Sequence, residues 1–172
     1  ACIAGVFGLE DALRLIAARG RLMQALPAGG AMLAVLADEK TVAPLVDARR
    51  GDVAIAAFNG PTSVVLSGSA VALHEIASQL AERDVRTTPL AVSHAFHSPL
   101  MAPMLEPFAE VARSVRYSLP RIDLISNVTG ALATKQIATP EYWVKHVSEP
   151  VRFAAGMRAT VQRQCTTYIE IG

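Results

Sequence analysis

The sequence has few cysteines and little charge of either sign. Its 172 residues contain two cysteines, 18% charged residues and a formal net charge of +1. Cys2 and Cys165 lie near opposite ends, which fits neither a disulfide framework nor a CxxC metal clip, and we expect a protein of a reducing, cytoplasmic compartment. Hydrophobic residues make up 52% of the chain, which predicts a folded core and argues against both disorder and a nucleic-acid-binding surface.

The chain also lacks a long hydrophobic run. The apolar stretch ACIAGVFGL, residues 1–9, is too short to span a bilayer, and no basic flank marks it as a signal peptide. We therefore predict neither a membrane nor a targeting segment. The chain starts at Ala1 in the middle of a pattern and stops at Gly172 after a strand-like run, so we expect it to be a fragment of a larger domain.

The middle of the chain, residues 31–92, alternates strand-like and helix-like patterns. Short apolar runs bounded by turn residues predict strands, and longer amphipathic runs predict helices. The expected order is a strand at 31–37, a helix at 40–49, strands at 53–59 and 63–68, a helix at 71–82 and a strand at 85–92. This βαββαβ order is that of the split βαβ, or ferredoxin-like, unit.

The flanking segments also mix helices and strands. Helices are expected at 9–26, 104–115 and 141–147, and another starts near Val151, just after Pro150. Strands are expected at 122–127 and 166–171. Because these segments alternate as in a larger α/β sheet, we assign the chain to the α/β class, with the βαββαβ unit as an α+β insert.

Arg19 interrupts the apolar face of the first predicted helix. One arc of that helix carries Leu9, Ala12, Leu15, Ile16, Leu22, Met23 and Leu26, and Arg19 projects from the middle of it. Either its stem lies along the core edge while the guanidinium reaches solvent, or the helix faces a cleft where the guanidinium needs an anionic partner. The planar guanidinium matches a carboxylate with two hydrogen bonds, so the second alternative predicts a carboxylate-bearing ligand.

His94 and His97 lie three residues apart in the segment AVSHAFHSPLM, residues 91–101. A metal site would need further ligands, but the segment contains no Cys, Asp or Glu, and His74 and His146 are distant in sequence. The alternatives are a structural loop and a general base for a Ser or Cys nucleophile. No G-x-S-x-G motif occurs and neither cysteine has an activating context, so the sequence presents half of a catalytic site.

Six sequence blocks together resemble a known family. They are AGVFGLEDALRLIAARGRLMQ, GAMLAVLA, AFNGPTSVVLSG, VSHAFHSPLMAPMLEPF, SNVTG and YWVKHVSEPVRF, in order across essentially the whole chain. The chain resembles the malonyl-type acyltransferase domain of modular type I polyketide synthases and, more distantly, the bacterial malonyl-CoA:acyl-carrier-protein transacylase. The resemblance implies an α/β-hydrolase-like subdomain, of which residues 1–30 and 93–172 would be parts, with an inserted ferredoxin-like subdomain at 31–92. It also implies a GHSxG serine motif before Ala1.

The same resemblance implies roles for particular residues. His97 corresponds to the family's catalytic base, which deprotonates the serine and later the carrier-protein thiol. Arg19 corresponds to the arginine that pairs with the free carboxylate of malonate. His146 lies where the family presents a backbone carbonyl to the base and so fixes its tautomer. Asn127 corresponds to a supporting residue near the site, with a turn asparagine as the alternative.

The tetrapeptide HAFH, residues 94–97, resembles the family's malonyl-selective motif, whereas methylmalonyl-selective members tend to carry a YASH-like motif. Phe96 would occupy the space that an α-methyl branch needs, and His94 would shape the same pocket. One methyl group changes binding by about 1–3 kcal/mol in such a pocket, so we expect a real but incomplete selectivity.

The resemblance implies an activity in polyketide or fatty-acid-like synthesis. Malonyl would pass from malonyl-CoA through an acyl-serine to the phosphopantetheine thiol of an acyl carrier protein, without a metal or redox cofactor. The expected partners are the carrier protein, the coenzyme A thioester and neighbouring synthase domains, and neither nucleic acid nor membrane. Without the serine, we expect this chain by itself to be inactive. Two other hypotheses stay open: a non-catalytic ferredoxin-like binding module, and a metal-dependent hydrolase that uses His94 and His97.

Overall fold

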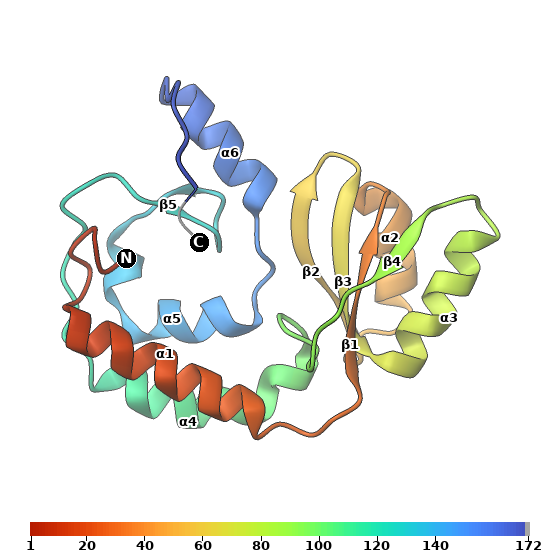
Figure 1. Cartoon of the computed structure of the whole chain (residues 1–172), viewed down its shortest axis with the longest axis horizontal. Helices are drawn as coiled ribbons and strands as arrows, with labels where there is room; N and C mark the ends of the chain where they lie inside the picture. Colours follow the sequence, from red (N-terminus) through yellow and green to blue (C-terminus); the bar gives the residue numbers. More distant parts are fainter. Residues whose placement is uncertain (171–172) are drawn as a thin grey trace.

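The computed structural model describes residues 1–170, which form two lobes (Figure 1). One lobe is a four-stranded sheet with helices α2 (Glu39–Asp47) and α3 (Ala70–Ala81) packed on one side. The other lobe is built around helices α1 (Leu9–Gln24), α4 (Ala102–Arg113) and α5 (Pro140–Ser148). Each lobe has its own cluster of buried apolar side chains. Helices and an open sheet are thus combined in one chain, and the predicted α/β class is confirmed.

The sheet has the strand order β2-β3-β1-β4, and every neighbouring pair is antiparallel. Its strands are β1 (Gly30–Val35), β2 (Val53–Gly60), β3 (Ser63–Ser69) and β4 (Thr87–Pro89). Helix α2 joins β1 to β2 and α3 joins β3 to β4, which is the βαββαβ order expected from the sequence. Because β2 lies at one edge, one row of its backbone groups is not used by the sheet.

Local hydrogen bonds explain where the two helices of this lobe begin. The Asp38 carboxylate accepts a hydrogen bond from the Thr41 backbone N–H at 2.9 Å and caps α2. Ser69 Oγ accepts one from the Ala72 N–H at 3.2 Å and caps α3. The helices and the sheet then bury a shared apolar core, which includes Leu33, Val35, Val42, Leu45, Val64, Leu66, Leu73, Ile76 and Leu80.

The other lobe is mainly helical. Helix α1 packs against α4, and α4 packs against α5. The buried core of this lobe includes Val6, Phe7, Leu15, Met101, Met104, Phe108, Ile137, Tyr142 and Val147. The remaining elements are the 3-10 helices η1 (Pro99–Met101) and η2 (Lys135–Ala138), the strands β5 (Ile125–Ser126) and β6 (Ala131–Leu132), and helix α6 (Phe153–Gln162). Helix α6 follows α5 and contacts β2 of the sheet lobe.

Three predicted strands differ in the structure. Of the strand expected at 85–92 only β4 pairs in the sheet, and of that expected at 122–127 only β5 forms, paired with β6. Residues 166–170 form no strand, and Ile171, the last residue of that prediction, lies outside the described residues. A strand needs a neighbour for its backbone hydrogen bonds. Within residues 1–170, β4 pairs only with β1 and β5 only with β6, and residues 166–170 pair with no strand, so the predicted larger sheet does not form within them.

Helix α1 buries a different part of its apolar arc than predicted. Leu15 and Ala18 are buried, but Leu9 and Ile16 are 68% and 61% exposed. A helical wheel reveals an apolar face without revealing which neighbours cover it, and here the contact with α4 leaves Leu9 and Ile16 uncovered. Arg19 consequently lies at the edge of the covered part, with its side chain half-buried.

Candidate active site

The loop between β4 and η1 carries both histidines singled out in the sequence. Ala95 in this loop is buried, and Ser98 Oγ donates a hydrogen bond to its carbonyl at 2.7 Å, which closes the loop on itself. His97 has a φ of 57°, in the left-handed region that non-glycine residues rarely adopt. Such backbone conformations persist only where the surroundings hold them, and they cluster at functional sites. The loop therefore presents His97 in one constrained conformation.

A backbone carbonyl orients the His97 ring. Its Nδ1–H donates a hydrogen bond to the Glu149 oxygen at 2.8 Å. Because a carbonyl can only accept, the proton of the neutral ring is on Nδ1 and the lone pair is on Nε2, which is the tautomer that a general base needs. Burial lowers the pKa of His97, the bond to Glu149 opposes this, and the positive charge of Arg19 lowers the pKa further. The ring is therefore neutral, and able to accept a proton, at pH 7.

The orienting carbonyl comes from Glu149 and not from the predicted His146. Glu149 directly follows α5 and has extended backbone angles, with φ −70° and ψ 149°. Pro150 explains this conformation, because its ring disfavours the helical conformation for the residue before it. The helix ends there, and the Glu149 carbonyl is turned out of the helix toward His97. The Glu-Pro pair was the signal in the sequence that could have identified this residue.

His146 contacts Arg19 instead. Arg19 Nη1 donates a hydrogen bond to His146 Nδ1 at 3.2 Å, and the imidazole stacks on Trp143 with ring centroids 5.8 Å apart. Burial, reinforced by the positive charge of Arg19 and by His97 when it is protonated at lower pH, lowers the pKa of His146 to about 4. A neutral His146 keeps its Nδ1 lone pair for the guanidinium. His146 thus positions Arg19, a contact that sequence reasoning missed because the two residues are far apart in the chain.

The contact with His146 uses only part of the hydrogen-bonding capacity of the Arg19 guanidinium. Its guanidinium has five N–H groups, of which one faces His146. Burial lowers the pKa of Arg19, but a guanidinium stays protonated in proteins. None of the ion pairs formed within residues 1–170 includes Arg19. The arrangement therefore places a partly desolvated cation with further N–H donors near the neutral His97 ring, and this pair of groups can bind an anion and accept a proton.

Both ring nitrogens of His94 are already engaged. The side chain is 8% exposed, its Nε2 contacts the Leu26 carbonyl at 3.2 Å, and its Nδ1 contacts Ser93 Oγ at 2.9 Å. Nε2–H donates to the Leu26 carbonyl and Nδ1 is engaged by the Ser93 hydroxyl, so His94 ties the loop to the segment that follows α1 and has no unengaged lone pair for a metal ion. Among residues 1–170, no group of three or more His, Cys, Asp or Glu side chains is arranged to hold a metal ion.

Phe96 belongs to the histidine loop, whereas Asn127 contacts the segment that follows α5. Phe96 packs against the core of the helical lobe, and its ring centroid lies 6.3 Å from that of His94. Asn127 is exposed, and its backbone carbonyl accepts a hydrogen bond from the Arg152 N–H at 2.8 Å. Arg152 follows Glu149 by three residues, so Asn127 supports the segment whose Glu149 carbonyl binds His97.

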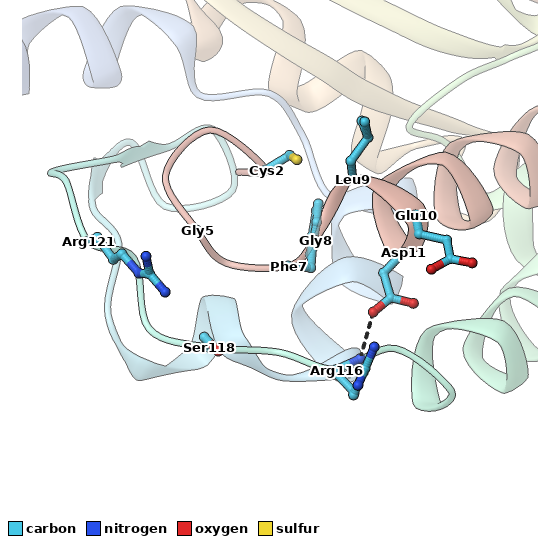
Figure 2. Close-up of a pocket in the computed structure, with 10 residues that line it drawn as sticks. All are labelled: Cys2, Gly5, Phe7, Gly8, Leu9, Glu10, Asp11, Arg116, Ser118 and Arg121. Atoms are coloured by element: carbon cyan, nitrogen blue, oxygen red, sulfur yellow. Dashed lines mark hydrogen bonds between the residues drawn. The ribbon is translucent and has the colours of Figure 1, made fainter.

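A separate cavity of about 700 Å³ opens beside the N-terminal segment (Figure 2). Cys2, Phe7, Asp11, Arg116 and Arg121 are among its lining residues. The Asp11 carboxylate in its wall accepts a hydrogen bond from the Arg116 backbone N–H at 3.3 Å. None of the predicted site residues lines this cavity. The cavity therefore lies apart from the loop histidine and the helix arginine.

The whole chain matches one family model. Residues 1–172 match the model of the acyl transferase domain. The chain belongs to this family. The acyltransferase chain is 54% identical over 98% of its length to the spectinabilin polyketide synthase system protein NorB of Streptomyces orinoci, and 50% identical over 99% of its length to the mycoketide-CoA synthase of Mycobacterium tuberculosis. It spans only 8% and 4% of these two proteins.

Solved structures agree with the family. The acyltransferase domain from the second module of the salinomycin polyketide synthase superposes with a TM-score of 0.92 and 50% identity, over 95% of this chain and 38% of that one. The malonyl-CoA:acyl carrier protein transacylase of Xanthomonas oryzae pv. oryzae gives a TM-score of 0.87 and 33% identity, over 96% of this chain and 55% of that one. The predicted relation to polyketide synthase acyltransferase domains and to the bacterial transacylase is confirmed.

Proposed function

We propose that this part of an acyltransferase domain binds the malonyl carboxylate and supplies the base of the transfer reaction. Arg19 is the observation that carries the proposal: a half-buried cation, held by neutral His146, without a carboxylate partner within residues 1–170. A partly buried charge without a counter-charge is costly, and a carboxylate can satisfy the guanidinium with two parallel hydrogen bonds. The name of the Xanthomonas oryzae relative, which specifies malonyl-CoA, agrees with this ligand.

His97 acts as general base in both halves of the proposed reaction. A serine hydroxyl gives its proton to Nε2 while its oxygen attacks the thioester carbonyl. The carbon–sulfur bond then breaks, and the coenzyme A thiolate takes the proton from Nε2. In the second half, the phosphopantetheine thiol of a carrier protein gives its proton to Nε2, its sulfur attacks the acyl-serine, and the serine oxygen leaves with that proton. The Glu149 carbonyl stabilises each imidazolium through Nδ1–H.

The nucleophile of this scheme is not among the 172 residues, which contain no G-x-S-x-G motif. We therefore propose that this chain by itself forms no acyl-serine. His94 and Phe96 form one wall of the acyl pocket in the proposal, with Phe96 in the space of an α-methyl group. The resulting preference for malonyl over methylmalonyl is incomplete, because one methyl group changes binding by about 1–3 kcal/mol.

The proposed reaction requires a carrier protein and a coenzyme A thioester and no metal or redox cofactor. The steps at Arg19 and His97 use only charge pairing and proton transfer, which these side chains supply themselves. Other domains of a multidomain synthase are the further proposed partners, because the curated relatives are polyketide synthases. We place the protein in the cytoplasm and expect neither nucleic acid nor a membrane as a partner. Within residues 1–170, no helix is long and apolar enough to cross a bilayer.

Intact-mass spectrometry after incubation with malonyl-CoA tests this proposal. We expect no added malonyl group on the 172-residue chain, and one added malonyl group on a polypeptide in which the chain is extended upstream through a GHSxG motif. Stable malonylation of the short chain would contradict the assigned need for an external serine. An unlabelled extended polypeptide that is folded would contradict the proposed acyl transfer.

A further inference from the structure

A four-residue segment, residues 149–152, connects α5 to α6 and runs beside the sheet lobe (Figure 1). We call this segment the strap. The Val151 N–H donates a hydrogen bond to the Ala56 carbonyl, and the Phe58 N–H donates one to the Val151 carbonyl, both at 2.8 Å. Ala57 and Val151 are therefore paired in a parallel bridge. The edge strand β2 thus uses its free backbone groups to hold the strap.

Arg152 anchors the same strap by two further contacts. Its backbone N–H donates a hydrogen bond to the Asn127 carbonyl at 2.8 Å. Its guanidinium carbon lies 5.4 Å from the centroid of the Phe58 ring, within the range of a cation–π contact. Phe58 packs against the core of the sheet lobe, so its ring is a firm support for the guanidinium. The strap is consequently tied to both lobes close to the carbonyl that orients His97.

We propose that the edge strand β2 positions the proposed base, and that Phe58 and Arg152 are positioning residues for His97. The link is short: Phe58 and Arg152 hold one end of the strap, and the Glu149 carbonyl at its other end accepts the hydrogen bond from His97 Nδ1. The sheet lobe thereby fixes the tautomer of a residue that lies outside it. The catalytic meaning of this link rests on the function proposed for His97, whereas the link itself is a property of the fold.

The physical consequence concerns the two ring nitrogens. If the strap moves away, Nδ1–H loses its acceptor and the ring can exchange its proton between the two nitrogens. The lone pair is then no longer confined to Nε2. The positive φ of His97 adds to this sensitivity, because a strained backbone depends on the contacts around it. Loss of the contact between Phe58 and Arg152 should therefore change the tautomer of the His97 imidazole even in a protein whose overall fold is unchanged.

Nuclear magnetic resonance of ¹⁵N-labelled histidine side chains in the 172-residue chain tests this link. In Phe58→Leu, which keeps an apolar side chain and leaves all charges in place, we expect a smaller fraction of the Nδ1–H tautomer of His97. Because the bond to Glu149 raises the pKa of His97, we also expect that pKa to fall by about 0.5 pH unit, a roughly threefold change in proton affinity typical of one weakened hydrogen bond. Arg152→Gln should act in the same direction.

The double variant Phe58→Leu/Arg152→Gln should change His97 no more than the stronger single variant, because both remove the same contact. Arg83→Gln is the matched control, since Arg83 is an exposed arginine that follows α3 on the sheet lobe, outside the strap. The inference is overturned if folded Arg152→Gln and Phe58→Leu proteins keep the tautomer and pKa of His97, or if Arg83→Gln changes them equally. The readout uses no catalysis, so failed acylation would contradict the proposed function and leave this result standing.

Discussion

Gly30→Ala is the substitution that most sharply tests how the sheet lobe holds the histidine loop. Gly30 is the first residue of β1, and a Cβ atom built there would lie 2.6 Å from the Ala95 nitrogen and 2.9 Å from the Ala95 Cβ. Ala95 lies between His94 and His97 and is buried. The clash is with backbone and with a short side chain, which have no flexible end that could swing away. The added methyl group must therefore displace the loop.

The expected cost follows from two opposing effects. Overpacking a well-packed site costs about 1–3 kcal/mol. Replacing glycine by alanine also restricts the unfolded chain, which stabilises the folded state by about 0.4–1 kcal/mol. We therefore expect Gly30→Ala to lower the free energy of unfolding by about 0–2.6 kcal/mol and to shift the ¹⁵N signals of the His97 imidazole.

Urea denaturation at pH 7 measures the first effect and the histidine ¹⁵N spectrum measures the second. Gly20→Ala is the matched control, because Gly20 lies inside α1 and has open space where its Cβ would be. Alanine should stabilise that helix by about 0.8–1 kcal/mol and leave His97 unchanged. If Gly30→Ala is as stable as the unmodified chain and its His97 signals do not move, the close approach of β1 to the loop does not constrain the site and the reasoning is refuted.

Two further predictions concern buried polar groups. Ser67 Oγ is buried without a hydrogen-bond partner in the part of the chain that the structure describes, so Ser67→Ala should stabilise the protein by about 1 kcal/mol. Ser126→Ala removes the 2.7 Å hydrogen bond to Tyr142 and should destabilise the protein by about 1–3 kcal/mol. Thermal denaturation of the two variants would contradict this if both shifts had the same sign. Burial holds the folded pKa of His146 at about 4, below its ordinary value of 6.5, so the unfolded chain binds more protons between these pH values. The contribution of His146 to the free energy of unfolding is therefore fully present above pH 6.5 and is lost as the pH falls toward 4. The loss is at most about 3 kcal/mol, and solvent screening of the partly exposed ring makes it smaller. His146→Gln keeps an acceptor for Arg19 and should weaken this dependence in urea denaturation at pH 7 and pH 5; an unchanged dependence would argue against a neutral buried His146.

The sequence allowed the sheet lobe to be predicted because its elements are consecutive. Alternating apolar positions, turn residues and helix caps such as Asp38 and Ser69 are all local signals, and they specify the βαββαβ order without reference to the rest of the chain. The strands expected at 122–127 and 166–171 carry the same local signals. Whether each of these segments forms a strand depends on whether a neighbouring strand is available for pairing, and a local sequence pattern does not contain that information.

The residues of the candidate site could be singled out by their type and position in the sequence, but their contact partners could not. Arg19 was recognisable because a charge on an apolar helix face is unusual, and His97 because of its place in the loop. The partners of both residues come from α5 and the strap, more than 50 positions away from His97 in the case of Glu149. That Glu149, and not His146, binds His97 could not be read from spacing, because it depends on how α5 ends before Pro150 and on how Arg19 of α1 contacts His146.

The most direct test of the central claim compares malonyl and acetyl transfer in the extended, serine-containing polypeptide. Arg19→Ala should slow labelling by malonyl-CoA at least about tenfold more than labelling by acetyl-CoA, because only malonyl has a free carboxylate and a hydrogen bond to a charged group contributes about 1.5–3 kcal/mol. Arg21→Ala, which removes an exposed arginine from the same helix, should leave the ratio of the two rates unchanged. Equal slowing of both acyl groups by Arg19→Ala would contradict the assignment of Arg19 as the malonyl-binding residue.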